Sequence, residues 1–439
     1  MTIRYLDLFA GAGGLSEGFV MSKYQPVAHI EMDTAACFTL KTRAAYHWLA
    51  NNDMLDIYRD YLSHKISRDE FYQQIPNDVL GSVMQYTMSE DNLPEIFQEV
   101  DERLGNHHLN LIIGGPPCQA YSLAGRARDT NHMVGDPRNY LYRIYASFLE
   151  RYQPEYFVFE NVLGLLSAKE TDGSKYFDLM RKAFKACGYV TEAKLLDARK
   201  YGVLQNRKRL ILIGRRGSED GFYPAIKEMS IDEYTVQDVL FDLPKIQAGG
   251  GTPLPVETAH CPEDAYLFTS GIKAYDREPV TLHWARPNNP QDLAIYKMSV
   301  EKWNENHTRV MYTDIPENMR THKNINSFLD RFKVVAGDLS YSQTVVAHLS
   351  KDGHYYIHPD INQNRSITPR EAARLQTFPD NYYFESISGN PSRTYAFKQI
   401  GNAVPVLLAH KIAEAIKGCF ENPDGYERNL KNVISYKTD

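Results

Sequence analysis

The fold class follows from one stretch near the start of the chain, Ile3-Arg4-Tyr5-Leu6-Asp7-Leu8-Phe9-Ala10-Gly11-Ala12-Gly13-Gly14. Its apolar part predicts a strand over Ile3–Phe9, its glycines a turn, and the residues after them a helix over Gly14–Ser22. Glycines let a ligand approach the backbone, and a helix N-terminus favours an anionic group. By itself, such a turn is also common as a purely structural feature.

The residues around this turn indicate which ligand it could hold. Glu31 ends the second predicted strand, about twenty residues further on, where an acid can bind ribose hydroxyls. The dinucleotide fingerprint would need glycine at position 16, where Ser16 stands. The pattern therefore suits a nucleoside ligand and does not require a pyrophosphate, which disfavours a dinucleotide oxidoreductase.

Strands and helices alternate through the rest of the first half, as the apolar patterns predict. Expected strands are Pro26–Glu31, Leu109–Ile113, Tyr156–Phe159, one around Leu195, and Arg209–Ile213; expected helices are Thr34–Leu49, Asn139–Arg151 and Tyr176–Ala186. Residues 51–107 are polar and predicted to be a mainly helical insertion. The alternation predicts an α/β fold with a mainly parallel sheet and helices on both faces.

The pattern changes after Gly214. Residues 217–345 are rich in proline, asparagine and turn signals, and Gly249–Gly251 is predicted to be a flexible joint. Strands are expected within Tyr341–His358. Thr368-Pro369-Arg370-Glu371 has the spacing of a capping box at a helix start, and a last helix is expected over Asn402–Lys417.

Composition narrows the class of protein. The 439 residues are 43% hydrophobic and 24% charged, as in a globular enzyme, and no signal peptide or membrane-spanning run is apparent. The five cysteines have no paired spacing, which argues for a reducing compartment and against a structural zinc or other metal site. The net charge of −6 means that any nucleic-acid surface would be a local basic patch.

Three further segments carry reactive side chains. Cys118 follows Gly114-Gly115-Pro116-Pro117 at the end of a strand, on a loop that its prolines stiffen. Glu160 ends the next strand and would lie at the same sheet edge. Arg207 and Arg209 alternate and would share one face of a strand. Taken singly, each has an ordinary alternative: an inert buried thiol, a helix cap, a solvated basic edge.

Together and in this order, the segments resemble the C5-cytosine-specific DNA methyltransferase family of bacterial restriction–modification systems. The resemblance rests on eight ordered segments: Asp7–Phe19, His29–Glu31, Gly115–Gln119, Asp136–Arg138 with Leu141, Glu160–Val162, Gln205–Arg209, Arg365–Pro379 and Gly401–Pro405. It implies a Rossmann-like, S-adenosylmethionine-dependent methyltransferase fold with a mixed sheet and a smaller, loop-rich target-recognition domain.

The resemblance assigns roles to individual residues. The implied catalytic residues are Cys118, Glu160, Arg207 and Arg209. The implied cofactor-binding residues are Asp7, Phe9, Ala10, Gly11, Gly13, Gly14, Glu31, Met32, Pro116, Leu141, Asn402 and Ala403. Two departures stand out: Met32 occupies a position where the family often has an aromatic residue, and the acid that contacts adenine has no clear counterpart beyond the stretch Met88–Asp91.

The chemistry of cytosine explains this set. C5 is too weak a nucleophile to take a methyl group until a thiolate, here that of Cys118, adds to C6. A protonated Glu160 would donate to N3, Arg209 would hold O2, and Arg207 would help to orient Cys118 and the backbone. A base inside a duplex cannot be reached, so it must be flipped out.

The expected organisation is a catalytic domain at 1–216, a target-recognition domain at 217–389, and a segment at 390–439 that completes the catalytic domain. We expect a cytoplasmic bacterial monomer, nucleoid-associated when bound to DNA, with duplex DNA as partner, a restriction endonuclease as genetic partner and no membrane contact. The alternatives are a tRNA cytosine-5 methyltransferase, which the long variable region at residues 217–345 disfavours, and an inactive DNA-binding homologue, which the intact catalytic residues disfavour.

Overall fold

The computed structural model describes residues 2–117, 137–217, 219–321 and 323–435. Within them, eight strands form one sheet in the order β10-β6-β7-β5-β4-β1-β2-β3. The strands are β1 Arg4–Leu8, β2 Gln25–Glu31, β3 Val83–Gln85, β4 Leu111–Gly114, β5 Tyr156–Asn161, β6 Tyr189–Asp197, β7 Lys208–Arg216 and β10 Ile434–Ser435.

The sheet is mixed, as the family resemblance implied. The neighbouring strands from β3 to β5 pair in parallel, which the strand–helix alternation predicted. β7 runs antiparallel to both of its neighbours, β5 and β6, and β10 runs antiparallel to β6. Because β7 is reversed, its first residues lie beside the carboxyl end of β5, where Glu160 pairs with Ile211.

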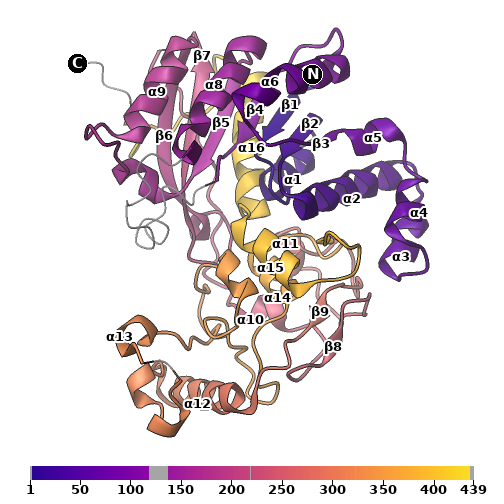
Figure 1. Cartoon of the computed structure of the whole chain (residues 1–439), viewed down its shortest axis with the longest axis vertical. Helices are drawn as coiled ribbons and strands as arrows, with labels where there is room; N and C mark the ends of the chain where they lie inside the picture. Colours follow the sequence, from indigo (N-terminus) through magenta and orange to yellow (C-terminus); the bar gives the residue numbers. More distant parts are fainter. Residues whose placement is uncertain (1, 118–136, 218, 322, 436–439) are drawn as a thin grey trace.

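Helices cover both faces of this sheet (Figure 1). On one face, α6 Leu93–Leu104, α8 Leu141–Tyr152 and α9 Tyr176–Ala186 pack on apolar residues of β1, β4 and β5. On the other, α1 Gly14–Met21 and α16 Val406–Glu421 pack together and against the sheet. The three-layer α/β architecture expected from the sequence is therefore confirmed, and α9 has the predicted bounds.

Residues 51–107 are only partly an insertion. The short helices α3 Leu55–Leu62, α4 Arg68–Tyr72 and α5 Asn77–Gly81 follow the long helix α2 Thr34–Asn51. After them, however, β3 pairs with β2 as the edge strand of the main sheet, and α6 covers its face. For this second half the predicted helical character is confirmed by α6, but the prediction that it forms an insertion was wrong, because a three-residue strand is too short to show alternation.

The lower part of the molecule contains helices, most of them short, joined by long loops (Figure 1). They are α10 Gln237–Leu240, α11 Tyr266–Thr269, α12 Pro290–Asn306, α13 Ile325–Phe328, α14 Pro369–Leu375 and α15 Arg393–Asn402. The predicted capping box at the start of α14 is present: Thr368 Oγ1 accepts from the Glu371 amide, and the Glu371 carboxylate accepts from the Thr368 amide.

Three local predictions in this part were wrong. Gly249–Gly251 is not a flexible joint, because it leads into the two-stranded sheet of β8 Gly251–Thr252 and β9 His283–Trp284 and hydrogen-bonds to the chain beyond β9. Tyr341–His358 contains isolated bridges and the 3-10 turn Ala347–Ser350 in place of strands. The last helix begins at Val406, because Pro405 stands as its N-cap.

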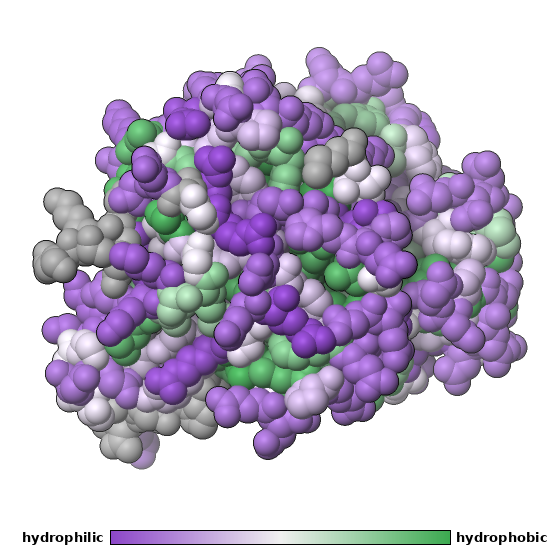
Figure 2. Space-filling view, turned by 90° about the horizontal axis from the view of Figure 1, so that it is seen from above, coloured by the Kyte–Doolittle hydropathy of each residue, from purple (hydrophilic) through white to green (hydrophobic). Residues whose placement is uncertain are grey.

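The space-filling view from above shows a surface that is mostly hydrophilic, with hydrophobic side chains in small separate patches (Figure 2). Within the described ranges, no helix combines the length and the apolar character needed to cross a membrane.

Candidate active site at the carboxyl edge of the sheet

The glycine-rich turn leaves the carboxyl end of β1 with an unusual backbone. Phe9, Gly11 and Gly13 have positive φ angles of 58°, 55° and 80°. A Cβ atom added at Gly11 would meet no atom within 4 Å, so the turn is open to a ligand at this residue. Ala10 and Gly13 are buried within the turn, and Gly14 begins α1.

Glu31 ties the turn to the end of β2. Its carboxylate accepts hydrogen bonds from the amides of Gly11, Met32 and Asp33, each at 2.8 Å. Burial raises the pKa of Glu31, against the opposing effect of these amides. The predicted contact of Glu31 with ribose hydroxyls stays a prediction; in the structure Glu31 is the acceptor that shapes the turn. Met32 beside it is 58% exposed, which leaves its thioether free to cover a planar ligand.

Two other residues predicted to bind the cofactor, Asp7 and Leu141, are less exposed than Met32. Asp7 is 1% exposed inside β1, where its carboxylate lies 3.3 Å from Nδ1 of His29, so its side chain contacts the protein core. Leu141 begins α8 and is half-buried. The segment after β3 lies next to Glu31, because the Tyr86 amide donates to the Glu31 carbonyl at 3.0 Å; the acid within Met88–Asp91 stays a prediction.

Glu160 and Arg209 form an ion pair next to Gly115, at the start of the loop that carries Cys118, the predicted nucleophile; this loop is called the nucleophile loop below. Arg209 Nε lies 2.7 Å from Glu160 Oε1, and the two side chains are 13% and 16% exposed. A Cβ atom added at Gly115 would lie 2.9 Å from Glu160 Oε2, so only glycine allows the loop to approach the carboxylate this closely. Burial raises the pKa of Glu160, although Arg209 and Arg207 oppose the shift.

The nucleophile loop is described only at its beginning. Pro116 is buried, and its carbonyl accepts from Asn161 Nδ2 at 3.4 Å. Cys118, Gln119 and Asp136 lie outside the described residues. Since the loop leaves β4 between the glycine turn after β1 and Glu160 at the end of β5, the structure brings three of the predicted segments to neighbouring strand ends.

Arg207 differs from Arg209 in its surroundings. It precedes β7, is 1% exposed, and donates to the carbonyls of Val345 (2.6 Å), Gly401 (3.1 Å) and Ala403 (2.7 Å). The predicted role of Arg207 in orienting Cys118 stays a prediction, because Cys118 lies outside the described residues. The predicted shared strand face was wrong, because β7 starts only at Lys208. Arg207 thereby holds the segment that carries Asn402, which is exposed, and Ala403, which is buried.

The basic residues of the variable region are mostly engaged within the protein. Arg309 and Lys333 lie 3.4 and 2.6 Å from Asp330 Oδ2, Arg331 pairs with Asp352, and Trp303 Nε1 donates to Asp338. Among the residues that the structure describes, no group of three or more histidine, cysteine or acidic side chains is placed to hold a metal ion.

Sequence reasoning missed one residue at this edge. The Tyr382 hydroxyl donates to the Ala12 carbonyl within the glycine turn at 2.5 Å. Tyr382 lies three positions beyond the segment Arg365–Pro379 that carried the resemblance. No local pattern connects it to a turn 370 residues earlier in the chain.

Comparisons with known proteins agree with this arrangement. A family model described as "C-5 cytosine-specific DNA methylase" matches residues 3–75 and 84–418. The Type II methyltransferase M.Bpa9945I of Bacillus paralicheniformis is 36% identical over 452 aligned positions, covering 94% of this chain and 98% of that relative. Type II methyltransferase M1.HphI of Haemophilus parahaemolyticus is 29% identical, covering 95% and 87%.

Solved structures share the fold. A prophage-encoded protein from E. coli matches with a TM-score of 0.61 at 20% identity, over 96% of this chain and 100% of that one. The Entamoeba histolytica methyltransferase EhMeth matches with a TM-score of 0.55 at 13% identity, over 97% and 100%.

Proposed function

The chain belongs to the C-5 cytosine-specific DNA methylase family and is a DNA cytosine-5-methyltransferase, and from this premise we propose that it flips a target cytosine out of duplex DNA and methylates it through a covalent adduct with Cys118. The observation that carries the proposal is the meeting of the glycine turn, the Gly115 loop and the Glu160–Arg209 pair at one sheet edge. Ligands of parallel α/β sheets collect at this edge.

We propose that the cofactor is S-adenosylmethionine, held at the glycine turn. The residues present fit such a group, because Gly11 leaves the turn open, Glu31 ends the neighbouring strand, and the Met32 side chain is exposed beside it. When bound, S-adenosylmethionine supplies the electrophilic methyl group that C5 of cytosine takes up.

The chain's own residues then have distinct tasks. The Cys118 thiolate adds to C6 of cytosine, which makes C5 carbanionic. Negative charge moves toward N3, where protonated Glu160 donates; its raised pKa favours the protonated form. Arg209, bound to one oxygen of Glu160, is proposed to hold the base at O2. After C5 has taken the methyl group, it loses its proton to solvent, and the electron pair of the broken C5–H bond expels Cys118 from C6 as the thiolate. N3 returns its proton to Glu160, which releases 5-methylcytosine.

Target choice is proposed to lie in residues 217–389, with residues 1–216 and 390–439 forming the reaction centre. Side chains in loops can reach base edges, and base contacts carry sequence information, whereas phosphate contacts only position the protein. Arg309, Arg331 and Lys333 would then have to break their ion pairs with Asp330 and Asp352 in order to contact DNA. A cognate restriction endonuclease is proposed as the genetic partner.

Methyl transfer by wild type and Cys118→Ala to long duplex DNA and to tRNA tests the proposal. We expect transfer by wild type to duplex DNA only, and none by Cys118→Ala, which should still bind DNA. Cys187→Ala is the matched control, because this half-buried cysteine caps the end of α9 just before β6 begins, at the opposite end of the strands from Glu160. Retention of even a tenth of wild-type turnover by Cys118→Ala would contradict the covalent mechanism, and transfer to tRNA alone would support the RNA-methylating alternative.

A further inference from the structure

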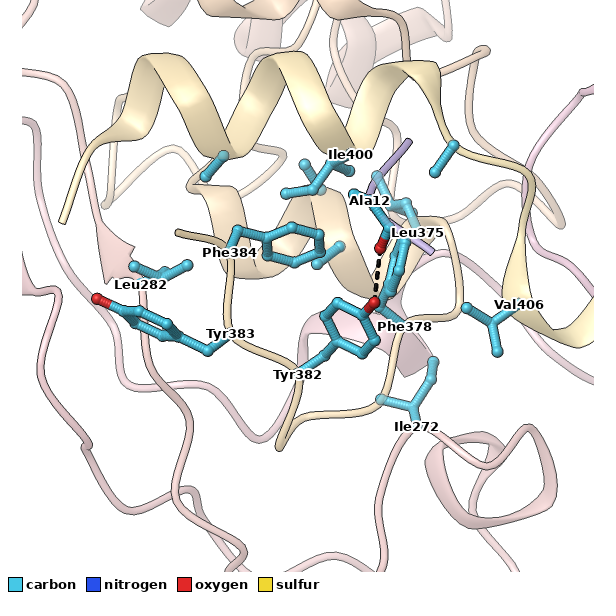
Figure 3. Packing of buried hydrophobic residues seen from close by; sticks show 14 of the residues in the cluster. Ala12, Ile272, Leu282, Leu375, Phe378, Tyr382, Tyr383, Phe384, Ile400 and Val406 are labelled. Atoms are coloured by element: carbon cyan, nitrogen blue, oxygen red, sulfur yellow. Dashed lines mark hydrogen bonds between the residues drawn. The ribbon is translucent and has the colours of Figure 1, made fainter. Parts of the chain in front are cut away.

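A tyrosine from a distant part of the chain packs against the glycine turn from inside the protein. The Tyr382 hydroxyl donates to the Ala12 carbonyl at 2.5 Å, and Tyr382 is 1% exposed (Figure 3). We find no other hydrogen bond to this carbonyl within the described part of the chain. A Cβ atom added at Gly13 would lie 2.8 Å from the hydroxyl oxygen, so the hydroxyl and the glycine occupy matched positions.

Tyr382 is itself held on several sides. Its backbone carbonyl accepts from Arg370 Nη2 at 2.7 Å. The Arg43 guanidinium lies over its ring, 4.7 Å from the ring centre, and Arg43 donates to Glu17 of α1 at 2.9 Å through Nε. The ring therefore has one position available, and its hydroxyl is presented to the turn without loss of rotamer freedom when it bonds.

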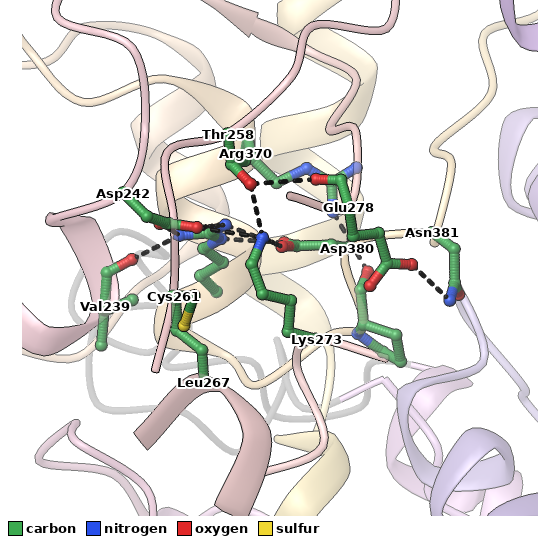
Figure 4. Close-up of polar contacts among 12 residues, drawn as sticks. Val239, Asp242, Thr258, Cys261, Leu267, Lys273, Glu278, Arg370, Asp380 and Asn381 are labelled. Atoms are coloured by element: carbon green, nitrogen blue, oxygen red, sulfur yellow. Dashed lines mark hydrogen bonds and ion pairs between the residues drawn. The ribbon is translucent and has the colours of Figure 1, made fainter. Parts of the chain in front are cut away.

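The residues just before Tyr382 are anchored in the lower part of the molecule (Figure 4). Asp380 lies 2.7 Å from Arg374 and 3.6 Å from Lys273, with all three side chains fully buried. Asn381 accepts from Arg43 and donates to Glu278, at 2.8 and 3.1 Å. Asp380–Tyr382 thus links the buried charges of the variable region to the turn after β1.

We propose that Tyr382 is a positioning residue for the cofactor, acting through the conformation of the glycine turn. This inference rests on the proposed function, in which the turn holds S-adenosylmethionine. A turn with left-handed residues at positions 11 and 13 has alternative conformations once its middle carbonyl loses its partner. Without the hydroxyl, part of the binding energy would go into ordering the turn.

The experiment compares Tyr382→Phe with Tyr383→Phe. Both remove one hydroxyl from a buried tyrosine of the same apolar cluster, and within the described residues the Tyr383 hydroxyl makes no hydrogen bond that we find. S-adenosylhomocysteine binding is measured by calorimetry, and initial rates on duplex DNA give KM for S-adenosylmethionine and kcat. We expect Tyr382→Phe to raise Kd and KM five- to tenfold, the effect of losing one buried hydrogen bond, with kcat within twofold of wild type.

Tyr383→Phe should leave Kd, KM and kcat unchanged, and equal melting temperatures of the two variants would exclude general loosening. A Kd of Tyr382→Phe equal to that of wild type overturns the inference, and so does a fall in kcat without a change in Kd. Failure of the wild type to bind S-adenosylhomocysteine would instead contradict the proposed cofactor site. If Tyr382→Phe does not fold, Tyr382→Met removes the same hydroxyl while keeping an apolar side chain, and it must show the same rise in Kd.

Discussion

Two carboxylate–arginine groups, one at the sheet edge and one below it, have opposite characters. Within the part of the chain that the structure describes, Glu160 makes one ion pair, with Arg209 at 2.7 Å, and both side chains keep some contact with solvent. Arg374 instead lies between Asp242 and Asp380, at 2.6 and 2.7 Å, with Lys273 3.0 Å from Asp242, and all four side chains are fully buried. Among the described residues, the first group pairs one carboxylate with one arginine, whereas in the second group every charge has at least one buried partner of opposite charge.

The pKa shifts follow this difference. Burial raises the pKa of Glu160, and Arg209 and Arg207 do not cancel the rise. Burial would raise the pKa of Asp242 too, but Arg374 and Lys273 hold it below its ordinary value. A carboxyl group that must give up a proton benefits from incomplete pairing, whereas a carboxylate that joins parts of a fold benefits from full pairing.

Among variants of the two groups, Glu160→Gln is expected to have the largest effect, which is on turnover. Turnover should fall by about 10²–10⁴-fold, the usual contribution of a positioned general acid, because the amide cannot supply the proton. The free energy of unfolding should change little, since the amide oxygen of the new side chain can still accept from Arg209 and the pair is in partial contact with solvent. Single-turnover methyl transfer measures the rate, and calorimetry with S-adenosylmethionine is the control. A loss of cofactor affinity equal to the loss of rate would place Glu160 in the cofactor site instead.

The same residue makes the rate depend on pH. Because the protonated form of Glu160 is the active one and its pKa is raised, wild-type turnover should decline as pH rises through that pKa. The decline should be absent from the residual activity of Glu160→Gln. A profile of single-turnover rate against pH for both proteins measures this, and an identical alkaline limb in both would assign the titration to another group.

Asp242→Asn should lower the stability of the fold and leave the activity nearly unchanged, the opposite of Glu160→Gln. Removing one carboxylate leaves Arg374 and Lys273 buried with insufficient negative charge, which typically costs about 3–5 kcal/mol of unfolding free energy. Turnover per folded molecule should stay within about threefold, since Asp242 does not contact the sheet edge. Urea unfolding and active-site titration measure the two quantities. An Asp242→Asn variant that is as stable as wild type but inactive would contradict the claim that the Asp242 group stabilises the fold and takes no part in catalysis.

Glu385 is an intermediate case and gives a smaller effect. It accepts from Thr42 and Tyr61 and lies 3.6 Å from Arg68, and burial raises its pKa to about 6. The folded state therefore binds this proton more tightly than the unfolded state, and that stability is present below the unfolded pKa and lost as pH rises through 6.

Glu385→Gln cannot titrate at this position, so it does not lose this stability as pH rises. The unfolding free energy of Glu385→Gln minus that of wild type should therefore increase by up to about 2 kcal/mol from pH 4.5 to pH 7.5. Urea unfolding at both pH values measures this difference. A difference that does not vary with pH would mean that Glu385 titrates normally, as an unburied carboxyl group does.

The elements that could be predicted from the sequence are those whose signals lie close together along the chain. The strand–turn–helix at residues 3–22, the helix α9 and the capping box at Thr368 follow from signals within a few residues of each other. Gly249–Gly251 was taken for a joint because its pairing partner, His283–Trp284, lies some thirty residues later. β3 gave no signal because it has only three residues.

The site residues also fall into those that a local motif predicts and those whose contacts join distant segments. Glu160 and Arg209 could be placed because each stands at a strand end within a recognisable motif. The carbonyl partners of Arg207, at Val345, Gly401 and Ala403, and the contact of Tyr382 with Ala12 join segments more than a hundred residues apart. No spacing rule reaches that far, so only the structure could supply these contacts.

The central claim is that Cys118 attacks C6 of a flipped cytosine, and trapping the adduct tests it most directly. Long duplex DNA in which 5-fluorocytosine replaces cytosine contains any short recognition site, and fluorine at C5 cannot leave as a proton does. With S-adenosylmethionine, wild type should form a denaturation-resistant complex whose adduct maps by mass spectrometry to Cys118, and Cys118→Ala should form none. Wild type that methylates the ordinary DNA yet leaves Cys118 unmodified on the fluorinated DNA would contradict the account.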